Sequence, residues 1–227
     1  MQYISIAIDG PSGAGKSTIS RAAAKRLGFL YVDTGAIYRS VGLYAMRAGV
    51  DKGDTNAICA LLPDIHITIR HGERGQKMLL NGEDVTSSIR EHAVSAWASA
   101  VSAVPQVRAF LLDMQRSFAR EHNVIMDGRD IGTVVLPDAA VKIFLTASPE
   151  DRARRRYEEL RQAGQDVDYA TILKDVNERD LNDSMRAAAP LRPAGDAVIA
   201  DTTGNTLDQS INLITSIIEE RIARDRL

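Results

Sequence analysis

Five short apolar segments recur along the chain and predict the strands of one sheet. They are rich in Val, Ile, Leu, Phe and Tyr, as expected for strands that are covered on both faces of a parallel sheet. Segments with helical spacing separate them, which favours right-handed crossovers and a doubly wound α/β fold. The predicted strands are residues 3–8, 29–32, 124–126, 141–146 and 197–200.

Apolar residues at helical spacing predict the helices. The last helix is the clearest, because Leu207, Ile211, Ile214, Ile218 and Ile222 form a single apolar stripe. The helix that starts at 105 has Pro105 at its first position, where proline is favoured. The other predicted helices cover residues 18–27, 88–103 and 105–120.

Between the second and third predicted strands, the pattern changes to alternation. Residues 65–69 alternate, residues 77–80 follow a turn-like segment at 71–75, and Asn81-Gly82 is a hairpin turn signal. These features predict a small antiparallel sheet inserted into the α/β core.

The stretch 149–193 is dense in charged residues. Such stretches occur in lids that close over phosphates, and also in solvated surface helices. The solvated surface explains the four arginines between 152 and 156 slightly better. Arg152 and Arg155, one helical turn apart, are weaker candidates to face a nucleotide.

Composition narrows the classes of ligand. A net charge of −2, a single tryptophan and 5% aromatic residues argue against a nucleic-acid surface or a membrane surface. Cys59 is the only cysteine, so no internal disulfide is possible and a reducing compartment is favoured. No secretory signal pattern and no run of about 20 apolar residues is visible in the sequence. We expect a cytoplasmic monomer with small-molecule ligands and with no nucleic-acid or membrane partner.

A glycine-rich segment lies between the first predicted strand and the first predicted helix. Its residues, Gly10-Pro11-Ser12-Gly13-Ala14-Gly15-Lys16-Ser17-Thr18, match the phosphate-binding loop G-x-x-x-x-G-K-[ST]. The glycines let backbone N–H groups face a polyphosphate at a helix N-terminus, Lys16 can reach the outer phosphates, and the Ser17 hydroxyl can ligate Mg²⁺. The flanking strand and helix supply the context that the motif requires, so we predict a nucleoside triphosphate site.

Three further segments combine arginine with aspartate. Residues 33–39 and 127–130 are predicted turns at the carboxyl ends of strands, where open parallel sheets bind ligands, and residues 179–186 lie in the charged stretch. Arg39, Arg129 and Arg186 together favour binding of one anionic acceptor group, although surface ion pairs would explain any one of them.

The order of these motifs resembles the bacterial cytidylate kinase family. The resemblance spans essentially the whole chain and includes the inserted sheet. It rests on Ile6-Ala7-Ile8-Asp9 before the glycine loop, Asp33-Thr34-Gly35-Ala36-Ile37-Tyr38-Arg39, Asp127-Gly128-Arg129-Asp130-Ile131-Gly132-Thr133-Val134-Val135, and residues 179–191.

The resemblance implies a P-loop NTPase core that transfers the γ-phosphoryl group of ATP to CMP or dCMP with Mg²⁺. It implies one kinase unit, with its core at 1–62, 104–148 and 194–227, an acceptor-binding insertion at 63–103 and a helical lid at 149–193. Gly10 to Thr18 would hold the ATP phosphates, and the catalytic groups would be Lys16, Arg129 and Arg186.

The resemblance also assigns the acceptor site. Arg39, Arg129 and Arg186 would grip the CMP phosphate, and Thr34 and Tyr38 would line the pocket. Arg179 and Asp183 would contact the ribose, whereas Ser99, Arg108 and Asp130 would read cytosine; for Ser99, a small polar residue on a helix is an equally good explanation. Asp33 and Asp127 end predicted strands near the loop and are candidates to hold Mg²⁺ through water, beside Ser17.

The chemistry of cytosine agrees with this assignment. An ionised Asp130 only accepts hydrogen bonds, which suits the exocyclic amine, and Arg108 only donates, which suits N3 and O2. Uracil places a carbonyl oxygen opposite the carboxylate, so we expect discrimination of roughly 10³ or more against UMP.

Two positions depart from the family pattern. Thr34 stands where many relatives have serine, which keeps the hydroxyl group. Asn182 stands where some relatives have arginine, which puts one lid or phosphate contact in doubt.

Three alternatives remain open. One alternative is a P-loop kinase whose acceptor is UMP or another small molecule. A non-catalytic nucleotide-binding regulator would be expected to lack Lys16 or the acceptor arginines, and all are present. A nucleic-acid kinase is disfavoured by the net charge of −2.

Overall fold

A computed structural model describes residues 3–72, 75–162 and 164–224. A five-stranded sheet has the order β2-β6-β1-β7-β8. Its central strand β1 pairs in parallel with β6 and β7, and β7 pairs in parallel with β8. The five predicted strands and the doubly wound α/β class are confirmed. The strands are β1 (Ser5–Asp9), β2 (Leu30–Asp33), β6 (Val124–Gly128), β7 (Val141–Thr146) and β8 (Val198–Asp201).

The chain divides into two compact units, which we describe separately. The first unit comprises Met1–Tyr31 and Ala119–Leu227, and the second comprises Val32–Phe118. The insertion at 63–103 and the lid at 149–193, as functional sub-regions, stay predictions. None of the helices in the described part of the chain has the length and apolar character needed to cross a lipid bilayer.

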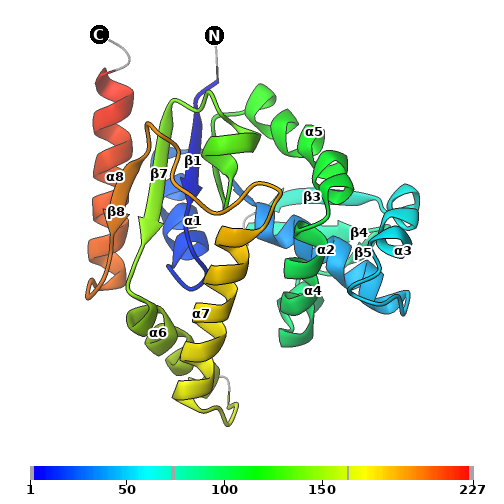
Figure 1. Cartoon of the computed structure of the whole chain (residues 1–227). Coiled ribbons are helices and arrows are strands. Elements are labelled where there is room, and N and C mark those ends of the chain that lie inside the picture. Colours follow the sequence, from blue (N-terminus) through cyan, green and yellow to red (C-terminus); the bar gives the residue numbers. More distant parts are fainter. Residues whose placement is uncertain (1–2, 73–74, 163, 225–227) are drawn as a thin grey trace. The chain divides into compact units, whose positions relative to one another are not determined.

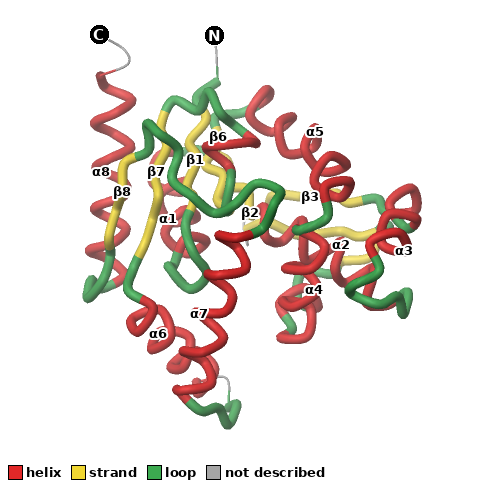
Figure 2. The backbone as a smooth tube through the Cα atoms, viewed as in Figure 1, coloured by secondary structure: helices red, strands yellow, loops and turns green. Residues whose placement is uncertain are grey.

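Helices α1 (Lys16–Leu27) and α8 (Leu207–Arg224) pack with the sheet of the first unit. The predicted stripe of α8 places Ile214 and Ile218 in the same buried cluster as Ile19 of α1 and Ile6 and Ile143 of the sheet. Figures 1 and 2 show α8 running alongside β8, the edge strand of the sheet. This core fixes the carboxyl ends of β1 and β6 beside each other, with Asp9 opposite Gly128.

The charged stretch of the first unit folds as two helices, α6 (Pro149–Gln162) and α7 (Tyr169–Met185). They share a small apolar cluster that contains Ala153 and Leu160 of α6 and Ile172 and Val176 of α7. The Asp168 side chain caps α7 by accepting a hydrogen bond from the N–H of Thr171 at 2.9 Å. Two helices therefore form here from few apolar residues.

The second unit contains the predicted inserted sheet, in the order β3-β4-β5. Antiparallel pairing of β3 with β4 confirms the predicted hairpin, although residues 73–74 of the turn-like segment lie outside the described residues. Positive φ angles of 49° at Asn81 and 88° at Gly82 confirm the second turn, which connects β4 to β5. The strands are β3 (Ile67–Gly72), β4 (Gly75–Leu80) and β5 (Glu83–Asp84).

The helices of this part of the chain correct two predictions. Residues 33–39 do not form a turn, because the Asp33 side chain accepts from the N–H of Ala36 at 2.8 Å and starts α2. The helix predicted at 88–103 begins as a separate 3₁₀ turn, Ser88–Arg90, and α4 starts only after the extended residue Glu91. The helices are α2 (Thr34–Arg47), α3 (Thr55–Ala60), α4 (His92–Ser102) and α5 (Pro105–Glu121), with a further 3₁₀ turn at Leu62–Asp64.

Candidate active site

The glycine loop begins where β1 ends. At Gly10 the φ angle is +151°, and a Cβ atom on this residue would lie 1.9 Å from the carbonyl oxygen of Leu145 in β7. Only glycine fits such a close approach of two backbones. The loop is therefore held against the neighbouring strand, and its first residue is determined by sterics.

The loop ends at the N-terminus of α1. Gly15 is the N-cap of this helix, with a φ of 83° and no side chain to cap it, and the first turn carries no acidic residue. The Lys16 side chain is buried, and its Nζ donates to the carbonyl oxygen of Pro11 at 2.7 Å. This arrangement of a helix N-terminus and an ammonium group is suited to an anionic group.

The charge of Lys16 is under opposing influences. Burial, followed by the positive charge of Arg129, holds the pKa of Lys16 well below its ordinary value. The carboxylates of Asp127, Asp183 and Asp9 act in the opposite direction. Residues from the turn after β6 and from α7 therefore lie within electrostatic range of the loop.

Ser17 and Asp127 form a pair of oxygen donors beside the loop. The Ser17 hydroxyl donates to Oδ2 of Asp127 at 3.0 Å, and the Tyr31 hydroxyl donates to Oδ1 of Asp127 at 2.8 Å. A hydroxyl and a carboxylate are ligands that Mg²⁺ accepts, so these two predicted residues fit a magnesium site. No sequence motif predicts that Tyr31 donates to Asp127.

Arginine and aspartate pair twice in the segment 129–186. Nε of Arg129 donates to Asp183 at 2.8 Å, and the Arg186 guanidinium lies 3.6 Å from the carboxylate of Asp130. Burial alone would raise the pKa of Asp183, but the charges of Arg129, Arg179 and Arg186 hold it below its ordinary value. Five predicted acceptor residues thus come together in the first unit.

Asp9 fixes the turn that directly follows two of these residues, Arg129 and Asp130. Its buried carboxylate accepts from the N–H groups of Ile131 at 2.7 Å and Gly132 at 2.8 Å, at the start of a π-helical turn, Ile131–Val135. Burial raises the pKa of Asp9 to about 6, although these two hydrogen bonds oppose the shift. The only hint in the sequence is the position of this acidic residue directly before the loop.

In the second unit, Asp33 gathers two arginines. Its buried carboxylate lies 3.3 Å from Nη2 of Arg39 and 2.7 Å from Nη2 of Arg90. Burial would raise the pKa of Asp33, but these two guanidinium groups lower it below its ordinary value. Arg90 lies on a 3₁₀ turn, and no motif in the sequence predicts a role for it.

The other predicted acceptor residues of the second unit lie on three helices. The guanidinium of Arg108 on α5 stacks 5.6 Å from the ring centre of Tyr38 on α2, and donates to the carbonyl oxygen of Ser102 at 3.2 Å. Thr34 is buried at the start of α2, and the half-buried Ser99 accepts through its carbonyl oxygen from the Ser102 hydroxyl at 2.9 Å.

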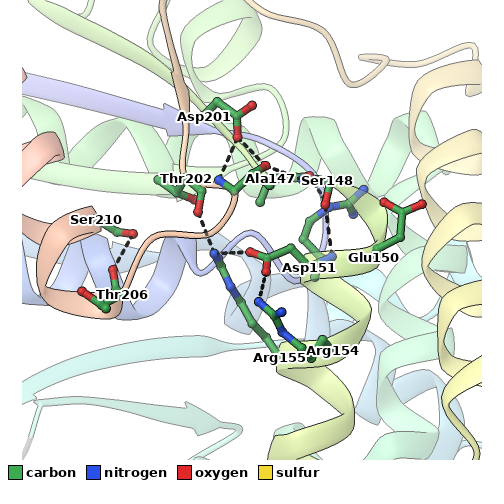
Figure 3. A network of polar contacts seen from close by, with 12 residues as sticks. Ala147, Ser148, Glu150, Asp151, Arg154, Arg155, Asp201, Thr202, Thr206 and Ser210 are labelled. Atoms are coloured by element: carbon green, nitrogen blue, oxygen red, sulfur yellow. Dashed lines mark hydrogen bonds and ion pairs between the residues drawn. The ribbon is translucent and has the colours of Figure 1, made fainter.

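The arginines of α6 are not a uniformly solvated surface, which corrects the favoured interpretation of residues 152–156. Arg152 is buried. Arg155 donates to Asp151 at 2.5 Å and to the carbonyl oxygen of Thr202 at 2.8 Å, and Arg154 also contacts Asp151. Figure 3 shows this network between α6 and the segment that follows β8. The contacts with Asp151 lie within one turn of α6, whereas the bond from Arg155 to Thr202 spans 47 residues and no local pattern predicts it.

Comparison with known proteins gives one consistent result. A profile of the cytidylate kinase family matches residues 6–220. The chain is 46% identical to a cytidylate kinase from Caldicellulosiruptor saccharolyticus, over 99% of this chain and 100% of the relative. It is 50% identical to a cytidylate kinase from Pelotomaculum thermopropionicum, over 94% of this chain and 95% of the relative.

Among solved structures, an uncharacterized protein from Eubacterium ventriosum has a TM-score of 0.53 and 14% identity, over 96% of this chain and 99% of that one. This likeness concerns the fold alone. The sequence relatives carry the assignment: the chain belongs to the cytidylate kinase family, the enzymes that phosphorylate CMP and dCMP.

Proposed function

We propose that this cytidylate kinase uses ATP as its phosphoryl donor, bound by Gly10 to Thr18, and accepts CMP or dCMP beside the Arg129 and Arg186 cluster. The observation that carries the proposal is that Ser17 of the glycine loop donates to Asp127 at 3.0 Å, and that Arg129, two residues further along, donates to Asp183 at 2.8 Å. A predicted donor residue and predicted acceptor residues therefore share one electrostatic environment within the first unit.

Transfer needs positioning and neutralisation of charge, and no covalent enzyme intermediate. Lys16 would bind the outer phosphates of ATP, and Arg129 and Arg186 would hold the phosphate of CMP in line with them. The arginines are already oriented by their carboxylate partners, Asp183 at 2.8 Å and Asp130 at 3.6 Å. Such preorganised donors act on developing charge without reorganising during the reaction.

Mg²⁺ would be held by the Ser17 hydroxyl and, through water, by Asp127, and it would neutralise phosphate charge when bound. The described residues contain no group of three or more His, Cys, Asp or Glu side chains suited to a metal, so phosphate oxygens and water would complete the shell. The carboxylate of Asp33, the other predicted candidate, is engaged by Arg39 and Arg90. This favours Asp127 for the role.

The remaining acceptor roles follow the family pattern. Arg39 would add a third guanidinium to the CMP phosphate, and Thr34 and Tyr38 would line its pocket. Arg179 and Asp183 would contact the ribose. The cytosine base would be read by Ser99, Arg108 and Asp130.

The test is the nucleotide preference of Asp130→Ala. We expect the ratio of kcat/KM for CMP over UMP to fall from roughly 10³ to about 10 or less, because the variant lacks the acceptor for the cytosine amine. The dissociation constant for ATP should stay within about threefold, since removing base recognition leaves the donor loop intact. An unchanged CMP preference would exclude the assignment.

Asp138→Ala is the matched control, because Asp138 is an exposed carboxylate only a few residues further along. It should behave as the wild type in both measurements. If UMP or AMP outpaced CMP in the wild-type enzyme, the proposed base pocket would be wrong from the start.

We also propose that the enzyme works as a monomer in the cytoplasm. Its one cysteine, Cys59, is free, as expected in a reducing compartment. Sedimentation equilibrium at micromolar concentration checks the monomer, and a dimer mass would contradict it.

A further inference from the structure

Arg152 has a larger set of contacts than the family motifs explain. Its guanidinium is buried, with a side-chain exposure of 3%, and it reaches three different segments. Nε donates to the carbonyl oxygen of Ala147 at 2.9 Å, and Nη1 donates to the carbonyl oxygen of Ser12 in the glycine loop at 2.8 Å. The two terminal nitrogens also donate to both carboxylate oxygens of Asp180 on α7, at 3.1 Å and 2.5 Å.

The contact between α6 and the glycine loop is close along the backbone as well. A Cβ atom at Gly13, where φ is +76°, would lie 3.2 Å from the Cβ of Arg152. A side chain at Gly13 would be strained at this φ and would require a shift of a few tenths of an ångström between the helix and the loop. The backbone of α6 at Arg152 therefore lies against the glycine loop, and the Arg152 guanidinium extends from there to α7.

Helix α7 also carries two of the predicted acceptor residues, Arg179 and Asp183. Asp183 lies one turn beyond Asp180 and accepts from Arg129 at 2.8 Å, and Arg186 follows the last residue of α7 as its C-cap, in extended backbone. Side chains three or four positions apart lie on one face of a helix. The pairs Arg152–Asp180 and Arg129–Asp183 thus hold successive turns of α7 at the end that faces the glycine loop.

The rest of α7 is held differently. Ile172 and Val176, in the first half of the helix, pack in the apolar cluster with α6. Beside Asp180, in contrast, lies an open cavity of about 380 Å³ that Pro11, Arg152 and Leu191 also line. At this end, the paired charges and the backbone hydrogen bond from the N–H of Leu191 to the carbonyl oxygen of Asp183, at 2.8 Å, connect α7 to its neighbours.

We propose that Arg152 and Asp180 form a positioning clamp that sets α7 relative to the glycine loop and so places the acceptor residues for transfer. A bidentate arginine–carboxylate pair fixes both distance and orientation, which a single hydrogen bond does not. In this proposal, Asp180 contacts neither the phosphates of ATP nor the phosphate of CMP. The inference rests on the acceptor roles proposed above for Asp183 and Arg186.

The test is Asp180→Asn, which keeps the shape of the side chain and removes its charge. We expect kcat to fall about 10-fold to 100-fold and KM for CMP to rise severalfold, because displacement of reacting groups by about 1 Å has effects of this size. The dissociation constant for ATP alone, measured by calorimetry, should change by less than about threefold, since Arg152 keeps its bonds to Ser12 and Ala147. The exposed Asp175→Asn on the same helix is the matched control and should leave all three values unchanged.

Asp180→Glu separates positioning from bulk stability. It restores the carboxylate one methylene further out, so kcat should lie between those of the wild type and Asp180→Asn. A lower melting temperature with wild-type kcat and KM would refute the clamp. If Asp180→Asn does not fold at the assay temperature, the same kinetics on Asp180→Glu decide: kcat within twofold of wild type overturns the proposal.

Arg186→Ala in the same series distinguishes the two proposals. If it loses CMP affinity while Asp180→Asn is indistinguishable from wild type, only the clamp is wrong. If Arg186→Ala keeps the wild-type KM for CMP, the acceptor assignment fails, and the clamp proposal fails with it.

Discussion

Asp9 makes the stability of this enzyme depend on pH in a direction that is unusual for a carboxylate. Its side chain is buried at the end of β1, and burial raises its pKa from 3.8 to about 6. The folded state therefore binds the Asp9 proton more tightly than the unfolded state does. The favourable contribution of this group is complete below pH 3.8 and is lost as the pH rises through about 6.

The magnitude follows from the shift in pKa. The folded and unfolded pKa values differ by about two units, so the free energy of unfolding is lower by about 3 kcal/mol when Asp9 is fully ionised, well above pH 6, than when it is fully protonated. Between pH 5 and pH 7, this contribution to the free energy of unfolding should fall by about 1 kcal/mol. Because Asp9 is only 4% exposed, solvent screening does little to reduce the effect.

The assay is urea unfolding of the wild type and Asp9→Asn at pH 5, 6 and 7. Asparagine has one carbonyl oxygen in place of the two carboxylate oxygens that accept from Ile131 and Gly132, so these hydrogen bonds are weakened, but this loss is the same at every pH and cancels in the comparison. We expect the wild type to lose about 1 kcal/mol relative to the variant between pH 5 and pH 7. Parallel pH profiles for the two proteins would refute the reasoning.

Two further predictions concern charged groups of the two units. Lys16→Ala should lower kcat for CMP by roughly 100-fold or more while the protein stays folded by circular dichroism, because one preorganised charge at the phosphates is removed; near wild-type turnover would contradict the mechanism. Arg90→Ala should raise KM for CMP severalfold in steady-state kinetics, because Asp33 then has Arg39 as its remaining guanidinium partner at 3.3 Å and competes more strongly with the CMP phosphate for it. An unchanged KM would show that Arg90 does not act through Arg39.

The central part of the sheet could be predicted from the sequence because its strands are apolar and largely buried. All five residues of β6 are buried, and the prediction placed a strand at 124–126. Residues 141–146 are both the predicted and the observed range of β7, in which Val141, Ile143 and Leu145 are buried. The turn at Asn81-Gly82 was predictable for a related reason, since positive φ angles strongly favour these two residue types. Where one local interaction dominates, the pattern decides the structure.

Residues 33–39 show where such patterns fail. Asp33 follows a strand, and an aspartate in that position is equally compatible with a turn and with the start of a helix. The choice depends on whether its side chain accepts from the N–H of Ala36, as it does here at 2.8 Å. The same carboxylate also accepts from two arginines, and one of them lies 57 residues away in the chain.

The burial of Arg152 was unpredictable for the same reason. On a helix with low hydrophobicity and several arginines, nothing local distinguishes the one that is covered. Two of its three acceptors are Ser12 and Asp180, which lie 140 and 28 residues away in the chain. Long-range pairing of this kind is set by the tertiary fold, so the sequence identifies the motifs of the site and leaves out the contacts that support them.

The paired charges of the first unit also suggest why recognition of phosphate and base would be linked. An unpaired buried charge costs several kcal/mol, so Asp130 and Arg186 stabilise each other before substrate arrives. On the proposed roles, the CMP phosphate draws Arg186 away from Asp130, and the cytosine amine then replaces the guanidinium as the partner of that carboxylate. UMP offers its phosphate but no amine, so Asp130 would lose the Arg186 guanidinium and gain no amine in exchange. Discrimination would then arise from the cost of breaking a pair inside the protein, in addition to the hydrogen bond that UMP lacks.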